Sequence, residues 1–233
     1  MSSVNLKRQK QLNAEIGQVM DDFDRFEYAF VTHWKKIVTA AVLVVVAVAV
    51  IVSAKVYANY RQNSAAAAFS QAVTAEALEK ALSEHSHASA AVAARLRLAG
   101  LYINAKNYDG ARRELQTVSA DKSMPELAWR ASLNLGYLAE LEGKIDEAAE
   151  IFAAFSRIEV PGSEGYRAES CANAGRLFLK AGKKAEAKEI LESGMLLASG
   201  TGAAAQAAAV WAQQIAFLQA ELAADNSAIP AAK

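Results

Sequence analysis

The fold is decided by residues 133–152, which read LNLGYLAELEGKIDEAAEIF. This stretch holds a small residue, Gly136, and an alanine, Ala148, on either side of a turn at Gly143. Small side chains at both points allow two antiparallel helices to approach closely, and Phe152, four residues after the alanine, fills the space beside them. The stretch therefore predicts a pair of closely packed α-helices.

The same pattern occurs before and after this stretch. Ala99 and Gly175 match the small residue, and Ala111 and Ala187 match the alanine, so both markers recur after 37 and then 39 residues. Two independent markers with one period indicate an internal repeat. Unrelated amphipathic helices are the alternative, because alanine occupies 53 of the 233 positions. From the repeat we predict an all-α fold in which residues 89–223 form a solenoid of stacked helix pairs.

These repeats resemble the tetratricopeptide repeat. The resemblance is carried most closely by Leu135-Gly136, Gly143, Ala148-Ala149, Phe152 and Pro161. The chain departs from the family pattern near the start of the first helix, where Ser132 and Cys171 stand in place of the usual aromatic residue. The resemblance implies a concave face that is lined by the first helix of each pair.

The resemblance also implies which residues line that face. The candidate protein-binding groove comprises Leu96, Ile103, Asn104, Arg130, Leu133, Tyr137, Glu140, Glu169, Arg176 and Lys180. The surface is mixed, with apolar and charged positions. Leu96 and Leu133 replace the lysine that clamps a peptide carboxylate in some members of the family, so capture of a C-terminal carboxylate is not expected. Each position could equally be an ordinary solvated or packed residue.

One long apolar segment precedes the repeats. Residues 37–54 run for 18 positions without a charge, and as a helix they span about 27 Å, close to the thickness of the hydrocarbon core of a membrane. Trp34 precedes the segment, and Tyr57 follows it, so that aromatic rings flank both ends. We expect an uncleaved transmembrane helix. A cleaved signal peptide is the alternative, which the small residue Ser53 and its neighbours leave open.

Basic residues predict the orientation of this helix. Lys35 and Lys36 directly precede the span, whereas Lys55 and Arg61 are the only cations close on its other side. Because positive residues favour the cytoplasmic side, the N-terminus is predicted to be cytoplasmic. The C-terminal domain is then periplasmic, in a bacterial inner membrane. A single cysteine suits that oxidising compartment.

The remaining segments complete the predicted domain order. Residues 1–36 form a cytoplasmic segment whose apolar stripe predicts an amphipathic helix; the stripe comprises Leu12, Ile16, Val19, Phe23, Phe26 and Phe30. The stripe could be a dimer seam, a membrane-interface face or a docking site, and a weakly ordered tail is the alternative.

The other segments lie around the repeats. Residues 55–88 are predicted as a linking helix, an alanine-rich helix at 203–222 as the cap of the stack, and residues 224–233 as a disordered tail.

Composition excludes several classes of function. The chain has 25 Lys and Arg against 25 Asp and Glu, and this zero net charge argues against a nucleic-acid partner. One cysteine and three histidines leave no framework for disulfides or structural zinc. The sequence contains none of the motifs GxxxxGK[ST], GxGxxG, HExxH or GxSxG. We therefore predict that the protein is not an enzyme and has no catalytic, cofactor or metal site.

The order of segments resembles the YfgM family. The resemblance rests on a cytoplasmic segment, one span, and an exit with Tyr57, the run Asn59-Tyr60-Arg61-Gln62 and the alanine-rich run 65–68 before Phe69. That family associates with the SecYEG translocon and a membrane-anchored periplasmic chaperone. The resemblance implies a periplasmic protein-interaction scaffold accessory to the Sec translocon, with translocon subunits, a chaperone or exported client chains as partners. The longer N-terminal segment departs from the family.

Two other functions fit the same architecture. One is a scaffold of envelope assembly or cell division, which would use the same groove for a different protein. The other is a membrane-bound regulator that signals through its cytoplasmic helix. The sequence alone does not separate these alternatives, and it predicts no oligomeric state.

Overall fold

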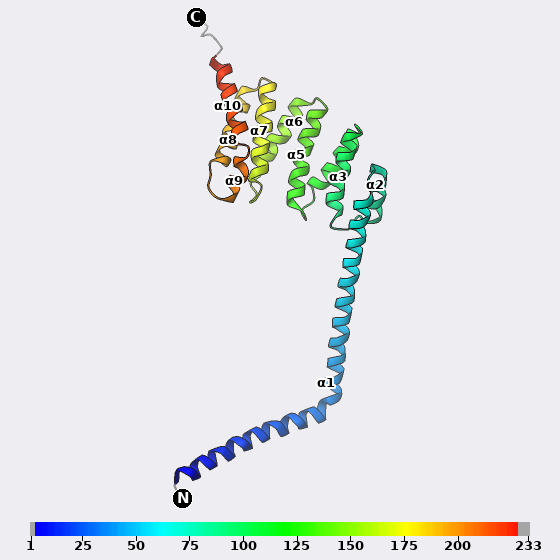
Figure 1. The fold of residues 1–233 in the computed structure, drawn as a ribbon, viewed down its shortest axis with the longest axis vertical. Coiled ribbons are helices and arrows are strands. Elements are labelled where there is room, and N and C mark those ends of the chain that lie inside the picture. The colour runs from blue at the N-terminus through cyan, green and yellow to red at the C-terminus, as the bar shows by residue number, and fades with distance from the viewer. Residues whose placement is uncertain (1–2, 228–233) are drawn as a thin grey trace. The chain divides into compact units, whose positions relative to one another are not determined.

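A computed structural model describes residues 3–227, except for the side chains of 3–6, 13, 15–26, 28, 29, 32 and 225–227. The chain divides into two compact units, residues 1–61 and 62–233. All regular elements in the described range are helices, which confirms the all-α prediction (Figure 1). In order they are α1 (Ser3–Gln71), α2 (Ala75–Glu84), α3 (Ala91–Asn104), α4 (Tyr108–Ser119), α5 (Pro125–Leu141), α6 (Ile145–Ser156), α7 (Glu164–Lys180), α8 (Lys184–Ala198), α9 (Ala203–Ala209) and α10 (Ala212–Ser227).

The first unit contains the apolar segment within α1. Among the described residues this is one helix that is long and apolar enough to cross a membrane, with a mean hydropathy of 3.0 in its best window. None of that window is buried, so no protein core accounts for its apolar side chains. The apolar stripe predicted upstream of it falls mostly on side chains outside the described residues, Ile16, Val19, Phe23 and Phe26.

The second unit begins with the last turns of α1. Ala65 and Phe69 are buried in one core cluster with α2 and α3, and Leu78 and Leu98 belong to the same cluster. The predicted linking helix at 55–88 is therefore two elements, the end of α1 and the short helix α2, which starts where the Thr74 side chain caps it. Much of this segment contributes to the core of the repeat array.

The three predicted repeats correspond to the pairs α3/α4, α5/α6 and α7/α8. The turn inside each pair has the same geometry, because Lys106, Gly143 and Gly182 all have a positive φ, between 58° and 79°. In each turn the backbone N–H of the third residue after the helix donates to a carbonyl five residues back, as from Lys144 to Ala139 at 2.9 Å. This is the hydrogen bond of a Schellman cap, in which glycine is favoured.

The small residues lie where the helices of a pair touch, as their spacing predicts. A Cβ atom on Gly136 would be 2.7 Å from the Phe152 ring, and one on Gly175 would be 2.6 Å from Cγ of Leu191. Phe152 and Leu191 are both fully buried. In the pairs α5/α6 and α7/α8, one large side chain therefore occupies the space left by the missing side chain of a glycine on the partner helix.

The stacking of the pairs distinguishes an inner from an outer side. The first helices of neighbouring pairs contact one another directly, α3 with α5 and α5 with α7. In the described part of the chain, the second helices α4, α6 and α8 have no comparable set of contacts among themselves. A stack whose first helices are closer together than its second helices curves toward the first helices. The candidate groove residues all belong to the helices of this side, α3, α5 and α7.

The end of the array differs from the predicted cap. Instead of one helix at 203–222, the structure has α9 and α10, which are separated at Val210 and Trp211 and which both contact α7 and α8. Ile215 and Leu218 of α10 are buried in the same core cluster as Phe152 and Leu191. Helix α10 continues to Ser227, so the first part of the predicted disordered tail is helical. Residues 228–233 lie outside the described residues.

The close approach at Gly136 can be tested by a single methyl group. Gly136→Ala is expected to lower the free energy of unfolding by about 1–3 kcal/mol, because the added carbon overlaps a buried ring. Gly100→Ala is the matched control: it lies inside α3 with no atom within 4 Å of the new Cβ, so it is expected to raise stability by about 0.5–1 kcal/mol. Chemical denaturation of the full chain in detergent, followed by circular dichroism, measures both. Equal effects of the two substitutions would contradict this account.

Candidate protein-binding face

The structure divides the predicted groove residues into three groups. Leu133 is fully buried in the core, so it packs the array instead of lining a surface. This corrects its prediction as a groove residue: three residues after Arg130 it faces the seam between helices, where neighbouring helices cover it. Leu96 and Ile103 are half-buried against the core of the first repeat, and Asn104 is exposed. The remaining six residues lie on α5 and α7, and we call them the first-helix face: Arg130, Tyr137, Glu140, Glu169, Arg176 and Lys180.

Glu169 is the centre of a hydrogen-bond network on this face. Its carboxylate accepts hydrogen bonds from Nη1 of Arg130 at 2.9 Å and from the hydroxyl of Tyr137 at 2.8 Å. The Asn173 amide donates to the Tyr137 hydroxyl at 2.8 Å and to the Glu169 carbonyl at 2.9 Å. A buried carboxylate is expensive unless it is paired and hydrogen-bonded, and here both conditions are met. The network therefore joins α5 to α7.

A second ion pair joins the same two helices further along. Nη1 and Nη2 of Arg176 donate to the two carboxylate oxygens of Glu140 at 2.8 and 2.7 Å. Nη2 of Arg176 also lies 3.3 Å from the Asn173 side-chain oxygen, which connects this pair to the Glu169 network. A bidentate guanidinium–carboxylate pair is both stronger and more directional than a single contact. Five of the predicted groove residues thus belong to one polar network.

Two members of the site were missed from the sequence. Asn173 bridges the two ion pairs, and Tyr166 stacks under the Arg130 guanidinium, 4.9 Å from its ring centroid. Both were recognisable in principle, because they lie three and four residues from Glu169, the spacing of one helix face. Arg130 and Tyr137 on α5 were predicted as groove residues, but no sequence signal pairs them with Tyr166 and Asn173.

The pKa shifts in the network favour a role in binding over a role in proton transfer. Burial, together with the hydrogen bond to Glu169, raises the pKa of the Tyr137 hydroxyl, which keeps it protonated. The Arg176 hydrogen bonds lower the pKa of Glu140, and Glu140 in turn raises the pKa of Arg176. These shifts move each pKa away from neutrality, whereas a general acid or base works best with a pKa near the working pH.

Cys171 and His85 both pack against the protein core. Burial raises the pKa of the Cys171 thiol to about 11, so the thiol stays protonated and unreactive at neutral pH. His85 packs edge-on against Phe69, with ring centroids 6.2 Å apart. Among the described residues no group of three or more His, Cys, Asp or Glu is placed to hold a metal ion.

A pocket of about 280 Å³ lies at one end of the first-helix face, and we call it the end pocket. It is formed between α5, the start of α7 and the junction of α9 with α10, and its lining residues are Arg130, Gly162, Gly165, Tyr166, Glu169, Ala207, Val210 and Trp211. Val210 is 78% exposed, which is unusual for a large aliphatic side chain in a folded domain. The end pocket combines apolar walls with the paired Arg130 guanidinium and Glu169 carboxylate, of which the arginine is the more exposed.

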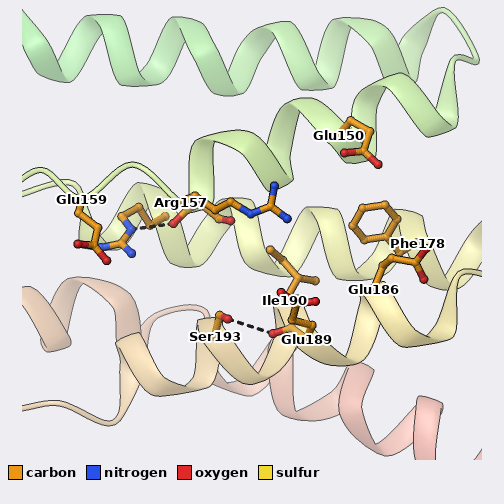
Figure 2. A pocket seen from close by; sticks show the side chains of 10 residues that line it. Glu150, Arg157, Glu159, Phe178, Glu186, Glu189, Ile190 and Ser193 are labelled. Atoms are coloured by element: carbon orange, nitrogen blue, oxygen red, sulfur yellow. Dashed lines mark hydrogen bonds between the residues drawn. The ribbon is translucent and has the colours of Figure 1, made fainter.

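A different pocket, of about 320 Å³, lies between α6, α7 and α8, and we call it the outer pocket (Figure 2). Phe178 and Ile190 contribute its apolar part, and Glu150, Glu159, Glu186 and Glu189 contribute carboxylates. Arg167 closes one wall by donating from Nε to the Ser156 carbonyl at 2.8 Å. At 3.6 residues per turn, Arg167 and Phe178 lie on the side of α7 opposite to Glu169. The outer pocket is therefore separate from the first-helix face.

The Glu140–Arg176 pair makes a contribution to stability that depends on pH. Because the folded pKa of Glu140 lies below its ordinary 4.5, the pair stabilises the fold above pH 4.5, and this is lost as the pH falls through the lower folded value. Glu140→Gln is expected to lower the free energy of unfolding at pH 7 by about 0.5–1 kcal/mol, and its difference from the unmodified chain should shrink below pH 4.5. Denaturation between pH 3 and 7 measures this. Glu189→Gln, which removes an exposed carboxylate, should show no such trend.

Comparison with known proteins assigns the family. A search of curated proteins found no match to the chain. The family model described as "Tetratricopeptide repeat-like domain" matches residues 29–208. The match begins before the apolar stretch and ends in α9, so it includes all three helix pairs. The chain therefore belongs to the tetratricopeptide repeat-like domain family.

Proposed function

We propose that this protein is a membrane-anchored scaffold that binds other proteins through its repeat array. One observation carries the proposal: a single chain holds both an apolar helical segment, whose most apolar 18 residues are all unburied, and a tetratricopeptide repeat-like array. Stacked helix pairs offer an extended inner surface, and such repeats generally serve as protein-interaction modules without catalysis. The paired, non-titrating network of the first-helix face is consistent with this role.

The finer proposal concerns the compartment and the partners. Lys35 and Lys36 beside the apolar segment favour a cytoplasmic N-terminus and a periplasmic array in a bacterial inner membrane. The resemblance to the YfgM family favours the Sec translocon, a periplasmic chaperone or exported chains as partners. The first-helix face is the proposed contact surface, because it lies on the inner side of the stack.

Membrane anchoring predicts a simple fractionation result. The full chain should stay in the membrane pellet after carbonate washing, whereas a chain that lacks residues 37–54 should be released, because the apolar helix supplies the attachment. When the outer membrane of whole cells is permeabilised and protease is added, the array should be digested, and a short N-terminal fragment should stay protected. Release of the intact full chain by carbonate would refute the anchor, and protection of the array would refute the orientation.

Partner binding can be tested by site-specific crosslinking in native membranes. A photo-reactive residue replaces Asn104 or Lys180, two exposed residues on the inner side of the stack, and crosslinked proteins are identified by mass spectrometry. The same residue placed at Lys188 or Glu189, exposed on α8, is the matched control. Translocon or chaperone subunits should be recovered from the inner positions and not from α8.

Other outcomes separate the alternatives. Recovery of division or envelope-assembly proteins from Asn104 and Lys180 would support the scaffold function but identify a different partner. Crosslinks from α8 alone, or none from the inner positions, would remove the first-helix face as the contact surface. A function lost on deletion of residues 1–30, with crosslinks from the array unchanged, would favour the regulator.

A further inference from the structure

The first-helix face presents more positive than negative charge to solvent. In the Arg130–Glu169 pair the arginine side chain is 40% exposed and the glutamate 8%. In the Arg176–Glu140 pair the corresponding values are 34% and 25%. Lys180 is also exposed, and in the described part of the chain it forms no ion pair. Because each anion is more buried than its cation, an approaching molecule meets a positive potential.

A stripe of polar residues runs along α7 from the end pocket to two basic side chains. Tyr166, Glu169, Asn173, Arg176 and Lys180 are spaced by 3, 4, 3 and 4 residues, so they form one stripe along α7. Tyr166 and Glu169 line the end pocket, while Arg176 and Lys180 lie at the other end of the stripe. The eleven residue steps from Glu169 to Lys180 correspond to a rise of about 17 Å along the helix. An extended peptide covers that distance with about five residues.

The end pocket has the size and chemistry of a side-chain site. Its 280 Å³ lies at the lower edge of the roughly 300–1,000 Å³ of typical small-molecule sites, which leaves room for one large side chain of a polypeptide. Tyr166, Val210 and Trp211 supply apolar walls. Arg130 has donors to spare, since among the described contacts it donates only from Nη1. Such donors suit carbonyl or carboxylate oxygens beside a bound side chain.

We propose that the first-helix face binds an extended acidic segment of a partner protein, with one large apolar side chain in the end pocket. The carboxylates of that segment lie four to six residues from the apolar side chain and meet Arg176 and Lys180. The inference rests on the proposed scaffold function and names the chemistry of its partner. A basic segment is excluded by like-charge repulsion along the stripe.

The test uses the full chain in detergent micelles and the peptide GSFGGSDEDGS, acetylated and amidated so that it has no charged termini. Isothermal titration calorimetry should show saturable binding at one peptide per chain. Replacing the peptide phenylalanine by glycine should weaken binding about tenfold, because the side chain leaves an apolar pocket. Replacing the three acidic residues by lysine should weaken it at least as much, and raised salt should weaken the binding of the acidic peptide.

Matched variants of the protein locate the site. Val210→Asp, in the end pocket, should weaken binding about tenfold, whereas Leu196→Asp, at a side chain 75% exposed outside the pocket, should have no effect. Lys180→Glu should weaken binding about threefold to tenfold and flatten its salt dependence, and Lys188→Glu on α8 should not. Circular dichroism melting checks that each variant is folded. Lys180→Glu changes a solvent-exposed side chain, so it keeps the test valid if Val210→Asp unfolds.

Several results would overturn the proposal. They are an absence of saturable binding up to about 1 mM peptide, equal binding of the lysine peptide, and equal losses from the control variants. These failures are distinct from failure of the scaffold function. If crosslinking at Asn104 and Lys180 recovers a partner while the peptide does not bind, the scaffold function is supported and the acidic-segment inference is refuted.

Discussion

The close approach of two helices at a residue without a side chain is the constraint on which the array depends. At Gly136 and Gly175 the space of a missing Cβ is taken by Phe152 and by Leu191. Dispersion contacts are weak singly and require atoms at van der Waals distance, so a gap at these crossings would forfeit them for the whole pair. The second and third pairs share this device, and the first pair has a small residue, Ala99, at the same place, so the first helices of the three pairs are presented to one another in a regular stack.

That regular stack explains how a charged residue can be buried between pairs. Glu169 on α7 reaches Arg130 and Tyr137 on α5 because the two first helices touch. A carboxylate in that position would be destabilising if α5 were displaced, since its partners would be lost while its burial remained. The polar network consequently favours one relative placement of neighbouring repeats, in addition to what apolar packing provides.

Much of the fold was predictable from sequence because the signal is local and repeated. The spacing of Ala111, Ala148 and Ala187 identifies the helix pairs, and Gly143 and Gly182 mark the turns of the second and third pairs. The break between α9 and α10 was not predictable, since no proline or glycine lies at Val210 or Trp211 and the break depends on packing against α7 and α8. Leu133 shows the same limit in the candidate site: helix periodicity places it near Arg130, but a neighbouring helix decides that it is buried.

The pairing within the site also constrains where binding energy can come from. Arg130 and Glu169 are 39 positions apart and already satisfy each other, and Arg176 already binds both oxygens of Glu140. A partner that displaced these contacts would have to replace them before gaining any affinity. Among the described contacts, the exposed groups beside the network form no hydrogen bond or ion pair: they are Val210 and Lys180, of which Lys180 interacts with Glu140 only at longer range. Affinity is therefore expected to depend mainly on Val210 and Lys180 at the edges of the network, while the paired residues hold the helices that carry them in position.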